Sequence, residues 1–366
     1  MEHKMIFAAD LHLGDRMYGL KDREEDFYSA ASVVFDKANY HAVDAVVLAG
    51  DVFDISRPQA KAVATLKDGV DTCNAPVFGI EGNHDRVGTG EWLYVCGVTP
   101  LGQVDYDSSL GVYGIDYLKP SALLEKMEEV ALMCENEELH IPVLVLHCGF
   151  AEMGDPFAAE VTFDNVMPFL KRMGTHTVLV GHIHQHMKKV AEYAGHMVTF
   201  LQPGSTEVGS LNEEKDKKIF LVLFNDAGLM ACEDIPIPTR KFNEIKIDTN
   251  EDYAKFIGSA DKDKDIQYSM NIVRVRNDID GAIAGIEQTM KKIGALVRLI
   301  PYGDEFTVEE IDRDNQIVSL ESVVEDYFEK GTDVYELLLE MLHNPEKTSE
   351  IAETYINSEK QQKKQS

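Results

Sequence analysis

The sequence is poor in the features that mark secreted and membrane proteins. Its 366 residues include five cysteines, none spaced as Cys-x-x-Cys, which argues against a disulfide framework and against a thiolate zinc site. No stretch approaches roughly 18 uninterrupted apolar residues, so we expect no membrane span. The N-terminal MEHKMIFAAD enters an apolar run without a basic region or a cleavage site, so we expect no secretory signal. These absences predict a cytoplasmic protein.

The sequence also has few positive charges. Lysine and arginine number 35 against 64 aspartates and glutamates, which gives a formal net charge of −29. Proteins that bind nucleic acid usually present a basic surface to the phosphates. Composition alone therefore argues against a nucleic-acid substrate, although an acidic surface also keeps proteins soluble in a saline cytoplasm.

The first 210 residues alternate short apolar runs with longer amphipathic stretches, which is typical of α/β layers. Because the apolar runs are almost continuous, we expect their strands to be covered on both faces. A strand with a return strand is predicted from 217 onward, with a turn at Asn225-Asp226. The earlier predicted strands are 5–9, 45–49, 76–80, 142–146 and 176–180, and the predicted helices are 23–39 and 59–73.

The character of the sequence changes around Pro236 and Pro238. A compact βαβαβ pattern follows, and beyond Asp304 the chain is acidic but still contains two apolar-periodic helices. The C-terminal end is polar and of low complexity, which is typical of disorder. We therefore predict four segments: a main domain at 1–238, a small domain at 239–303, a helical segment at 304–357 and a disordered tail at 358–366.

Each predicted strand of the main domain is followed by side chains that bind metal ions. Open α/β sheets place their ligands beyond the carboxyl ends of the strands, so we expect these side chains to converge. One such histidine alone would more often be structural, but the ordered set indicates a metal site. The candidate ligands are Asp10, His12, Asp51, Asn83, His147, His182 and His184.

The chemistry of these ligands indicates two ions. Imidazole, carboxylate and amide oxygen without thiolate suit a borderline divalent ion such as Mn(II), Fe(II) or Zn(II). Seven ligands are too many for one tetrahedral ion, but they suit two ions that share a carboxylate and clamp a phosphate. His84 stands beside Asn83, where it could protonate a leaving oxygen or stabilise the transition state. His186 continues the alternation after His184, and we expect it to be a bystander.

The motifs DLHLG, GDVFD, GNHD, LHCG and GHIH, in this order, resemble the pattern of calcineurin-like metallophosphoesterases. With 16-RMYGLKDREED-26 and 202-QPGSTE-207, the sequence is more closely similar to SbcD-type nuclease subunits of DNA double-strand-break repair complexes. The resemblance covers the main domain densely and the rest more loosely. It implies an α/β fold: a four-layer metallophosphoesterase β-sandwich flanked by helices, a small α+β capping (DNA-binding) domain and a C-terminal helical pair.

The resemblance also implies a role for each motif residue. Asp54 departs from archaeal and eukaryotic relatives, which often have a second catalytic histidine there, and Cys148 stands where the family often has glutamine. Two Mn(II) ions are the expected cofactors, with Mg, Fe and Zn left open. One ion is assigned to Asp10, His12, Asp51 and His184; Asp51 bridges to a second ion held with Asn83, His147 and His182; and His84 is the catalytic histidine.

Two further sets of residues are assigned to partners. Basic and aromatic residues near the motifs are candidate DNA contacts, although ordinary surface charge explains them equally well. Apolar stripes on the C-terminal helices fit the coiled-coil base of an SbcC-type ATPase, with packing against the chain's own core as the alternative. The DNA candidates are Arg16, Tyr18, Arg23, Arg57 and Arg86, and the partner candidates are Val323, Tyr327, Phe328, Leu337, Leu338 and Met341.

The function implied by the resemblance is a Mn-dependent DNA nuclease that works with an SbcC-type ATPase on double-stranded DNA ends. We expect a double-strand 3'-5' exonuclease and single-strand endonuclease, nucleoid-associated in the cytoplasm. We also expect a homodimer through the helices near 59–73 and after GNHD. The alternative is a generic binuclear metallophosphodiesterase acting on a small phosphodiester or nucleotide, which would share every ligand. A catalytically quiet repair scaffold is a third possibility that the intact ligand set disfavours.

Overall fold

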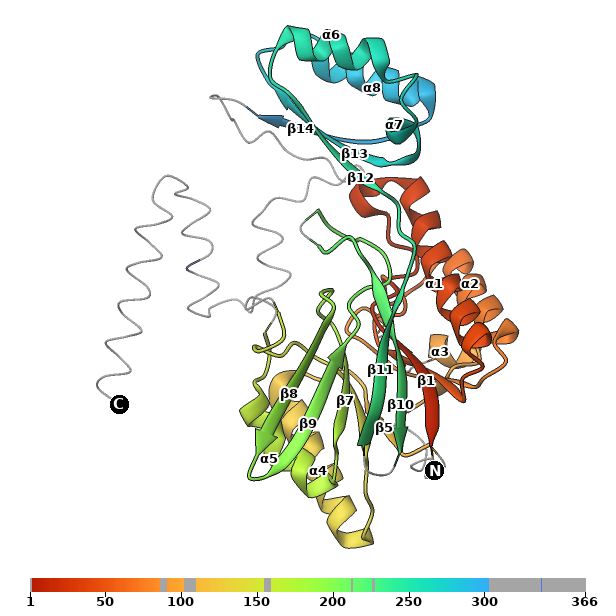
Figure 1. Ribbon diagram of the computed structural model, residues 1–366, viewed down its shortest axis with the longest axis vertical. Coiled ribbons are helices and arrows are strands. Elements are labelled where there is room, and N and C mark those ends of the chain that lie inside the picture. The colour runs from red at the N-terminus through yellow and green to blue at the C-terminus, as the bar shows by residue number, and fades with distance from the viewer. Residues whose placement is uncertain are drawn as a thin grey trace, which may run out of the picture. The chain divides into compact units, whose positions relative to one another are not determined.

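Two β-sheets stacked face to face form the centre of the first part of the chain in the computed structural model (Figure 1). The structure describes residues 2–85, 91–101, 110–154, 159–211, 213–225, 228–302 and 337. The chain divides into two compact units, Met1–Pro301 and Tyr302–Ser366.

The first sheet has six strands in the order β11-β10-β1-β2-β3-β4. Strands β1 to β4 run parallel to one another, whereas β10 and β11 form an antiparallel hairpin on the far side of β1. The strands are β1 (His3–Ala8), β2 (Ala45–Ala49), β3 (Val77–Ile80), β4 (Thr99–Pro100), β10 (Lys218–Asn225) and β11 (Gly228–Pro236).

The second sheet has five strands in the order β5-β6-β7-β9-β8. All neighbours are parallel except β8 and β9, which form an antiparallel hairpin at one edge. The strands are β5 (Val112–Ile115), β6 (Val143–His147), β7 (Thr177–Gly181), β8 (Met187–Tyr193) and β9 (His196–Gln202).

Alternating side chains of the central strands serve two different cores. In β1, Met5 and Phe7 point into the space between the sheets, while Ile6 points to the helices outside. In β6, Val145 faces the other sheet and Leu146 faces outward. Because successive strand residues point to opposite faces, a nearly continuous apolar run is what a sheet buried on both faces requires.

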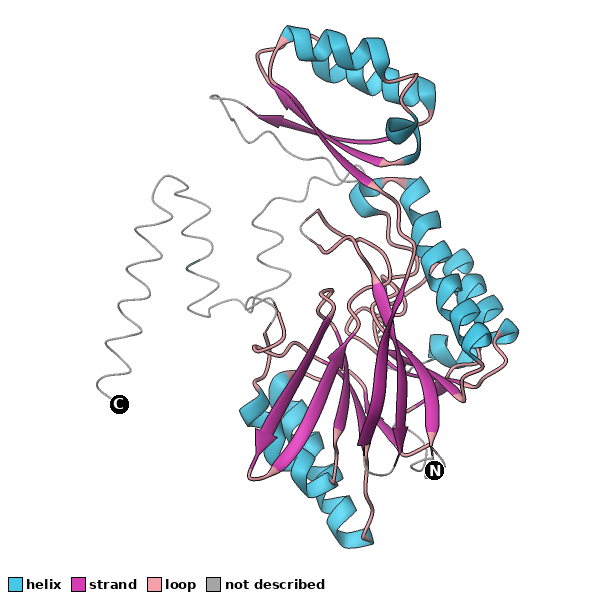
Figure 2. Ribbon diagram, viewed as in Figure 1, coloured by secondary structure: helices cyan, strands magenta, loops and turns pink. Residues whose placement is uncertain are grey.

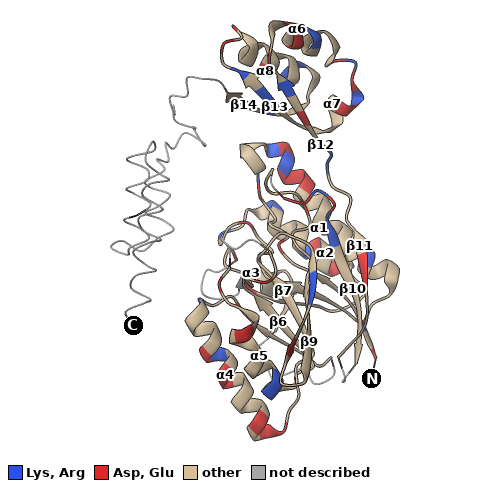
Figure 3. Cartoon of the chain, turned by 60° about the vertical axis from the view of Figure 1, so that its left-hand side comes forward, with Lys and Arg blue, Asp and Glu red and all other residues tan. Residues whose placement is uncertain are grey.

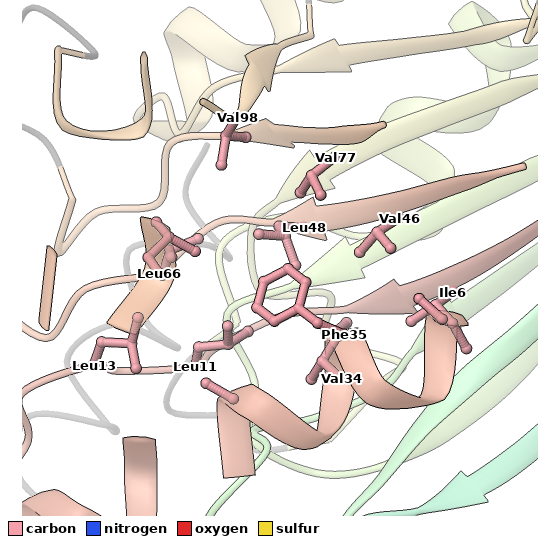
Figure 4. Close-up of a cluster of buried hydrophobic side chains, with 14 of the residues drawn as sticks. Ile6, Leu11, Leu13, Val34, Phe35, Val46, Leu48, Leu66, Val77 and Val98 are labelled. Carbon is pink, nitrogen blue, oxygen red and sulfur yellow. The ribbon is translucent and has the colours of Figure 1, made fainter. Parts of the chain in front are cut away.

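Helices cover the outer face of each sheet, which completes four layers (Figure 2). Figure 4 shows the core under the first sheet, where Phe35 and Leu66 of its covering helices meet Leu48. The first sheet is covered by α1 (Lys21–His41) and α2 (Ala60–Thr72), and the second by α4 (Pro120–Glu137) and α5 (Phe163–Met173). Two shorter elements are η1 (Met17–Gly19) and α3 (Glu91–Val95).

A third, three-stranded sheet follows in the chain, in the order β12-β13-β14. It has its own apolar core, in which Val273 and Val275 of the central strand pack on Ile286 and Met290 of a helix. Its elements are β12 (Phe242–Ile247), α6 (Asn250–Ser259), α7 (Lys264–Tyr268), β13 (Met270–Arg276), α8 (Ala282–Ile293) and β14 (Leu296–Tyr302).

The predicted fold class is confirmed, since an α/β sandwich with outer helices and a small α+β portion is what the chain forms. Each predicted strand of the main domain matches a strand to within two residues at its start, and the predicted return strand is β11. β5, the β8–β9 hairpin, α4 and α5 were not predicted from the sequence. The hairpin was missed because β8 is mostly exposed and mixes polar with apolar residues.

Several predictions concern residues beyond this description. The predicted C-terminal helical pair lies outside the described residues, and so do Val323, Tyr327, Phe328, Leu338 and Met341. Leu337 alone of the predicted partner residues is described, as a helical and partly buried residue. The four segment boundaries stay predictions. None of the described helices is long and apolar enough to cross a membrane.

Candidate metal centre

The candidate ligands lie at the carboxyl ends of β1, β2, β3, β6 and β7, where His147 is the last residue of β6 and the others lie in the loops that follow the strands. The loops after β1 and β2 are tied together, because the Asp10 N–H donates to Gly50 O at 3.0 Å and the His12 N–H donates to Asp51 O at 3.0 Å. Asp10, His12, Asp51 and His182 have positive φ angles of 52°, 44°, 48° and 104°. Left-handed backbone is costly for such residues and gathers at functional sites, so four strained candidate ligands side by side mark this edge of the sandwich.

The first cluster contains Asp10, His12 and His184, whose ligand atoms all lie within 4.8 Å of one another. Nε2 of His12 lies 3.0 Å from Nε2 of His184. The Asp10 carboxylate is held in place by the backbone N–H of His182, which lies 3.0 and 3.1 Å from its two oxygens. Strand ends that are far apart in the sequence thus direct three donors to one point.

The second cluster contains Asp51, His147 and His182. Oδ2 of Asp51 lies 3.2 Å from Nε2 of His147. Oδ1 of Asn83 lies 3.1 Å from the same nitrogen and 3.0 Å from Nδ1 of His182. Because Asp51 Oδ2 is also 4.0 Å from Nε2 of His12, its carboxylate stands between the two clusters.

In three of the candidate histidines, Nδ1 faces away from the site and lies close to a carbonyl or carboxylate oxygen. Nδ1 of His147 donates to the Ala49 carbonyl oxygen at 2.7 Å, Nδ1 of His184 lies 3.0 Å from Glu213, and Nδ1 of His12 lies 3.4 Å from Asp54. A proton on Nδ1 leaves a lone pair on Nε2, and each Nε2 faces the site. Backing of this kind is typical of metal-ligating histidines.

The electrostatics of the site favour cations. Burial lowers the pKa of His12, but the carboxylates of Asp54, Asp51 and Asp10 raise it by more than burial lowers it, so the pKa is about 9. His147 behaves alike: burial lowers its pKa, Asp51 and Asp10 raise it, and the result is about 9. Burial raises the pKa of Asp51, yet His147 and His12 hold it well below its usual range. Buried carboxylates that make histidines bind protons this strongly would bind a divalent ion in their place, so the residues fit two metal ions.

His84 is exposed, and one of its ring nitrogens lies within 4.8 Å of ligand atoms of His12 and Asp51, which belong to the two clusters. Its ring meets that of His12 edge-on, with 4.9 Å between the ring centroids. Its backbone N–H donates to Asp51 Oδ1 at 2.8 Å, and its Nδ1 donates to the backbone carbonyl of Asp54 at 2.6 Å. The second nitrogen is therefore the one that can exchange a proton with a bound substrate.

Three residues support the site through contacts that were not predicted from the sequence. Asp85 is buried and accepts backbone N–H groups of Val52, Phe53 and Gly82 at 3.1, 2.7 and 2.9 Å, which locks the loops after β2 and β3 together. Asp54 faces His12 with its side chain and His84 with its backbone. Glu213 stands behind His184, and no motif signalled it.

His186 does not take part in either cluster. Its Nδ1 donates to the Pro203 carbonyl oxygen at 3.1 Å, and its Nε2 lies 3.2 Å from Asp234 on β11. Both ring nitrogens are thus engaged away from the other histidines, as expected for a bystander.

The predicted DNA contacts fall into different environments. Arg23 is fully buried and donates to Asp26, Glu207 and the Val208 carbonyl oxygen. It cannot reach DNA from this position, so the prediction for Arg23 is wrong: the charge serves a buried network rather than the surface.

The other candidate DNA contacts remain at or near the surface. Arg16 is partly exposed and pairs with Glu24 at 2.7 Å. Tyr18 is partly buried, with the Arg298 guanidinium 5.2 Å from its ring centroid. Arg57 is exposed, and Arg86 lies outside the described residues.

The chain is similar to known phosphoesterases and repair proteins. The family model described as "Calcineurin-like phosphoesterase" matches residues 3–186, a range that includes both clusters and His84. The DNA double-strand break repair protein Mre11 of Methanosarcina mazei is 30% identical over 81% of this chain and 49% of its own length. The protein of the same name from Methanocaldococcus jannaschii is 24% identical over 96% of this chain and 98% of its own length.

The chain spans about half the length of the Methanosarcina relatives that it matches. Among solved structures, a dimetal phosphatase from Danio rerio is 12% identical with a TM-score of 0.42, covering 64% of this chain and 98% of that one.

Proposed function

The chain belongs to the calcineurin-like phosphoesterase family, and from this membership we propose that it is a Mn(II)-dependent DNA nuclease. In this proposal it hydrolyses phosphodiester bonds as a double-strand 3'-5' exonuclease and single-strand endonuclease. It acts with an SbcC-type ATPase at double-strand breaks.

The observation that carries the proposal is the meeting of two donor clusters at Asp51. Asp10, His12 and His184 lie on one side of it, and His147 and His182 lie on the other. Two divalent ions in such a site would neutralise phosphate oxygens and would lower the pKa of a water molecule, which is the chemistry that phosphodiester hydrolysis requires. Mn(II) suits this mixture of imidazole and carboxylate, and the donor set leaves Mg, Fe and Zn open.

The chain itself supplies the proton chemistry through His84. Its Nδ1 is fixed by the Asp54 carbonyl oxygen, so its orientation is set before substrate binds. The exposed Nε2 can donate a proton to the leaving oxygen or a hydrogen bond to the charged transition state. We therefore assign His84 as the catalytic residue, next to the ions rather than among their ligands.

DNA is preferred over a small phosphodiester because of the extent of the similarity. The relatives named DNA double-strand break repair proteins match 81% and 96% of this chain, well beyond the residues that hold the clusters. A small-substrate phosphodiesterase has no need for the three-stranded sheet of β12 to β14. The alternative activity on a small phosphodiester or nucleotide stays open to test.

Two partners belong to the proposal. An SbcC-type coiled-coil ATPase would bind the predicted helical segment at 304–357, and a second copy of the chain would bind near α2 and α3. Tyr94 and Val95 of α3 are large apolar side chains that are 49% and 58% exposed. Exposed apolar residues grouped on one short helix support a protein contact there.

End-labelled duplex DNA with Mn(II) tests the proposal. Wild type should release nucleotides, and His84→Ala should reduce the rate by about 10²- to 10⁴-fold, the usual contribution of general acid–base catalysis. His41→Ala, at the end of α1, removes a histidine far from the clusters and should leave the rate unchanged. If wild type cleaves a small diester such as bis(4-nitrophenyl) phosphate but no DNA, with or without the ATPase, the nuclease proposal fails.

A further inference from the structure

His184 is backed by a carboxylate that belongs to none of the sequence motifs. Its Nδ1 lies 3.0 Å from Oε1 of Glu213, and the Glu213 side chain is 13% exposed. Glu213 lies in the segment between β9 and β10, 29 residues beyond the histidine that it contacts. The pair therefore forms through the fold rather than through local sequence.

The other carboxylate oxygen of Glu213 is held by three partners. Oε2 lies 2.8 Å from Nζ of Lys217, 3.1 Å from the Gly209 backbone nitrogen and 3.1 Å from the Ser205 hydroxyl. Lysine and a backbone N–H can only donate hydrogen bonds. Oε2 thus faces donors, and because the oxygens of an ionised carboxylate can only accept, Oε1 accepts from Nδ1 of His184. The Lys217 side chain is itself only 3% exposed, so the clamp is built into the interior.

We propose that Glu213 is a positioning residue that keeps the His184 proton on Nδ1 and so presents the Nε2 lone pair to the metal ion of the first cluster. This inference rests on the proposed function, since it assumes that the clusters bind metal. A carboxylate behind a ligating histidine fixes its tautomer and raises its basicity. Glu213 therefore acts on the ion through His184 without touching it.

The two metal positions differ in the charge of the groups that contact Nδ1 of their histidines. In the first cluster, His184 is backed by the Glu213 carboxylate and His12 by the Asp54 carboxylate. In the second cluster, His147 is backed by the neutral Ala49 carbonyl oxygen. A charged partner increases the basicity of an imidazole more than a neutral one does. The first cluster therefore binds its ion more tightly and loads first.

One isosteric substitution tests this arrangement. In Glu213→Gln, the donors Lys217 and Gly209 would hold the amide oxygen in the place of Oε2. The amide NH2 would then occupy the place of Oε1 and donate toward Nδ1 of His184. That contact favours the tautomer with its proton on Nε2, which faces the first cluster. The substitution thus turns the lone pair of His184 away from the ion.

Two control variants separate this effect from simpler ones. Lys217→Met breaks the same buried ion pair but leaves the carboxylate oxygen facing His184. Glu214→Gln makes the same change of charge at an exposed neighbouring position. If Glu213→Gln does not fold because Lys217 loses its counterion, the double variant with Lys217→Met removes both charges and replaces it in the experiment.

The experiment is a titration of the metal-free, full-length chain with Mn(II) alone, followed by the electron paramagnetic resonance signal of free Mn(II). We expect wild type and Glu214→Gln to bind two ions, the first more tightly. Glu213→Gln should weaken the tighter position by about 10- to 100-fold and leave the other unchanged. Lys217→Met should lower the melting temperature of the metal-free protein with a much smaller change in affinity.

The outcomes separate the two proposals. If Glu213→Gln binds two ions with wild-type affinities, the role of Glu213 is refuted while the metal centre stands. If wild type binds no Mn(II), the proposed Mn(II) centre is refuted, and the positioning role at that ion with it. If wild type binds two ions and Glu213→Gln weakens the tighter position, but wild type cleaves no DNA, only the nuclease assignment is lost.

Discussion

A substitution at Gly204 should disturb both the stability of the sandwich and the metal centre. Gly204 has a φ angle of +74°, and a Cβ atom added there would lie 2.6 Å from the backbone carbonyl oxygen of His184. Such a distance is well inside van der Waals contact, and the atom that it meets is backbone. Gly204→Ala would therefore push on the loop between β7 and β8, which carries the candidate ligand His184.

Two other glycines separate the cost of a left-handed backbone from the cost of a steric clash. Gly195, in the β8–β9 turn, has a φ angle of +78° but open space around its Cβ position, so Gly195→Ala adds strain without a clash. Gly258, exposed in α6, has neither feature, and Gly258→Ala should stabilise the helix by up to about 1 kcal/mol. A left-handed residue with a Cβ costs about 1–2 kcal/mol, and overpacking costs about 1–3 kcal/mol more.

These contributions predict an order of melting temperatures in the metal-free protein. Gly258→Ala should equal or exceed wild type, Gly195→Ala should lose about 1–2 kcal/mol and Gly204→Ala about 2–5 kcal/mol. In a domain of this size each kcal/mol lowers the melting temperature by about 2–4 °C. Only Gly204→Ala should also weaken Mn(II) binding. Equal losses at Gly195 and Gly204, with unchanged Mn(II) affinity in both variants, would refute this reasoning.

Three further predictions concern protonation and charge. The raised pKa values of His12 and His147, about 9 in each case, stabilise the metal-free fold fully below the unfolded value near 6.5. The melting temperature of the protein, measured with a metal chelator present, should therefore fall as the pH rises from about 6.5 to 9. The affinity for Mn(II) should rise over the same pH range because the ion displaces protons from the histidines. If neither quantity changes with pH, the proposed site is contradicted. Arg23→Met should lower the free energy of unfolding by about 3–5 kcal/mol, because it leaves Glu207 buried without its partner, and chemical denaturation measures this. Arg57→Gln should weaken duplex DNA binding regardless of sequence and reduce the slope of log affinity against log salt by about 1; an unchanged slope would remove Arg57 from the DNA surface.

The sequence predicts the layers of this fold well because the central strands are buried on both faces. Met5 and Phe7 serve one core and Ile6 another, so the strand is apolar throughout and stands out from its surroundings. The convergence of the candidate ligands could be predicted for a related reason. Parallel strands end at a common edge, so Asp10 and Asp51, each two residues beyond the end of its strand, could be expected to lie close together.

Residues that act through tertiary contacts could not be predicted in this way. Glu213 sits in an acidic and basic stretch, 213-EEKDKK-218, where nothing distinguishes it from its exposed neighbour Glu214. Arg23 stands in a charged stretch typical of a surface helix, yet the fold places it against Glu207 from a segment 184 residues away. Whether a charged residue can be buried depends on a partner that is distant in sequence. The hydrophobic periodicity around the residue does not reveal that partner.

The acidic composition of the chain affects how strongly it would bind the proposed DNA substrate. Acidic and basic residues are interspersed along α1 (Figure 3), and Arg16 and Arg23 are both paired with carboxylates of that helix. Two of the five predicted DNA contacts therefore contribute little net positive charge to the surface. Phosphate affinity would then come mainly from the two metal ions and from the ATPase partner. We accordingly expect the isolated chain to bind duplex DNA weakly, with an affinity that collapses as salt rises. Tight binding by the chain alone that persists at high salt would show that a basic surface exists elsewhere.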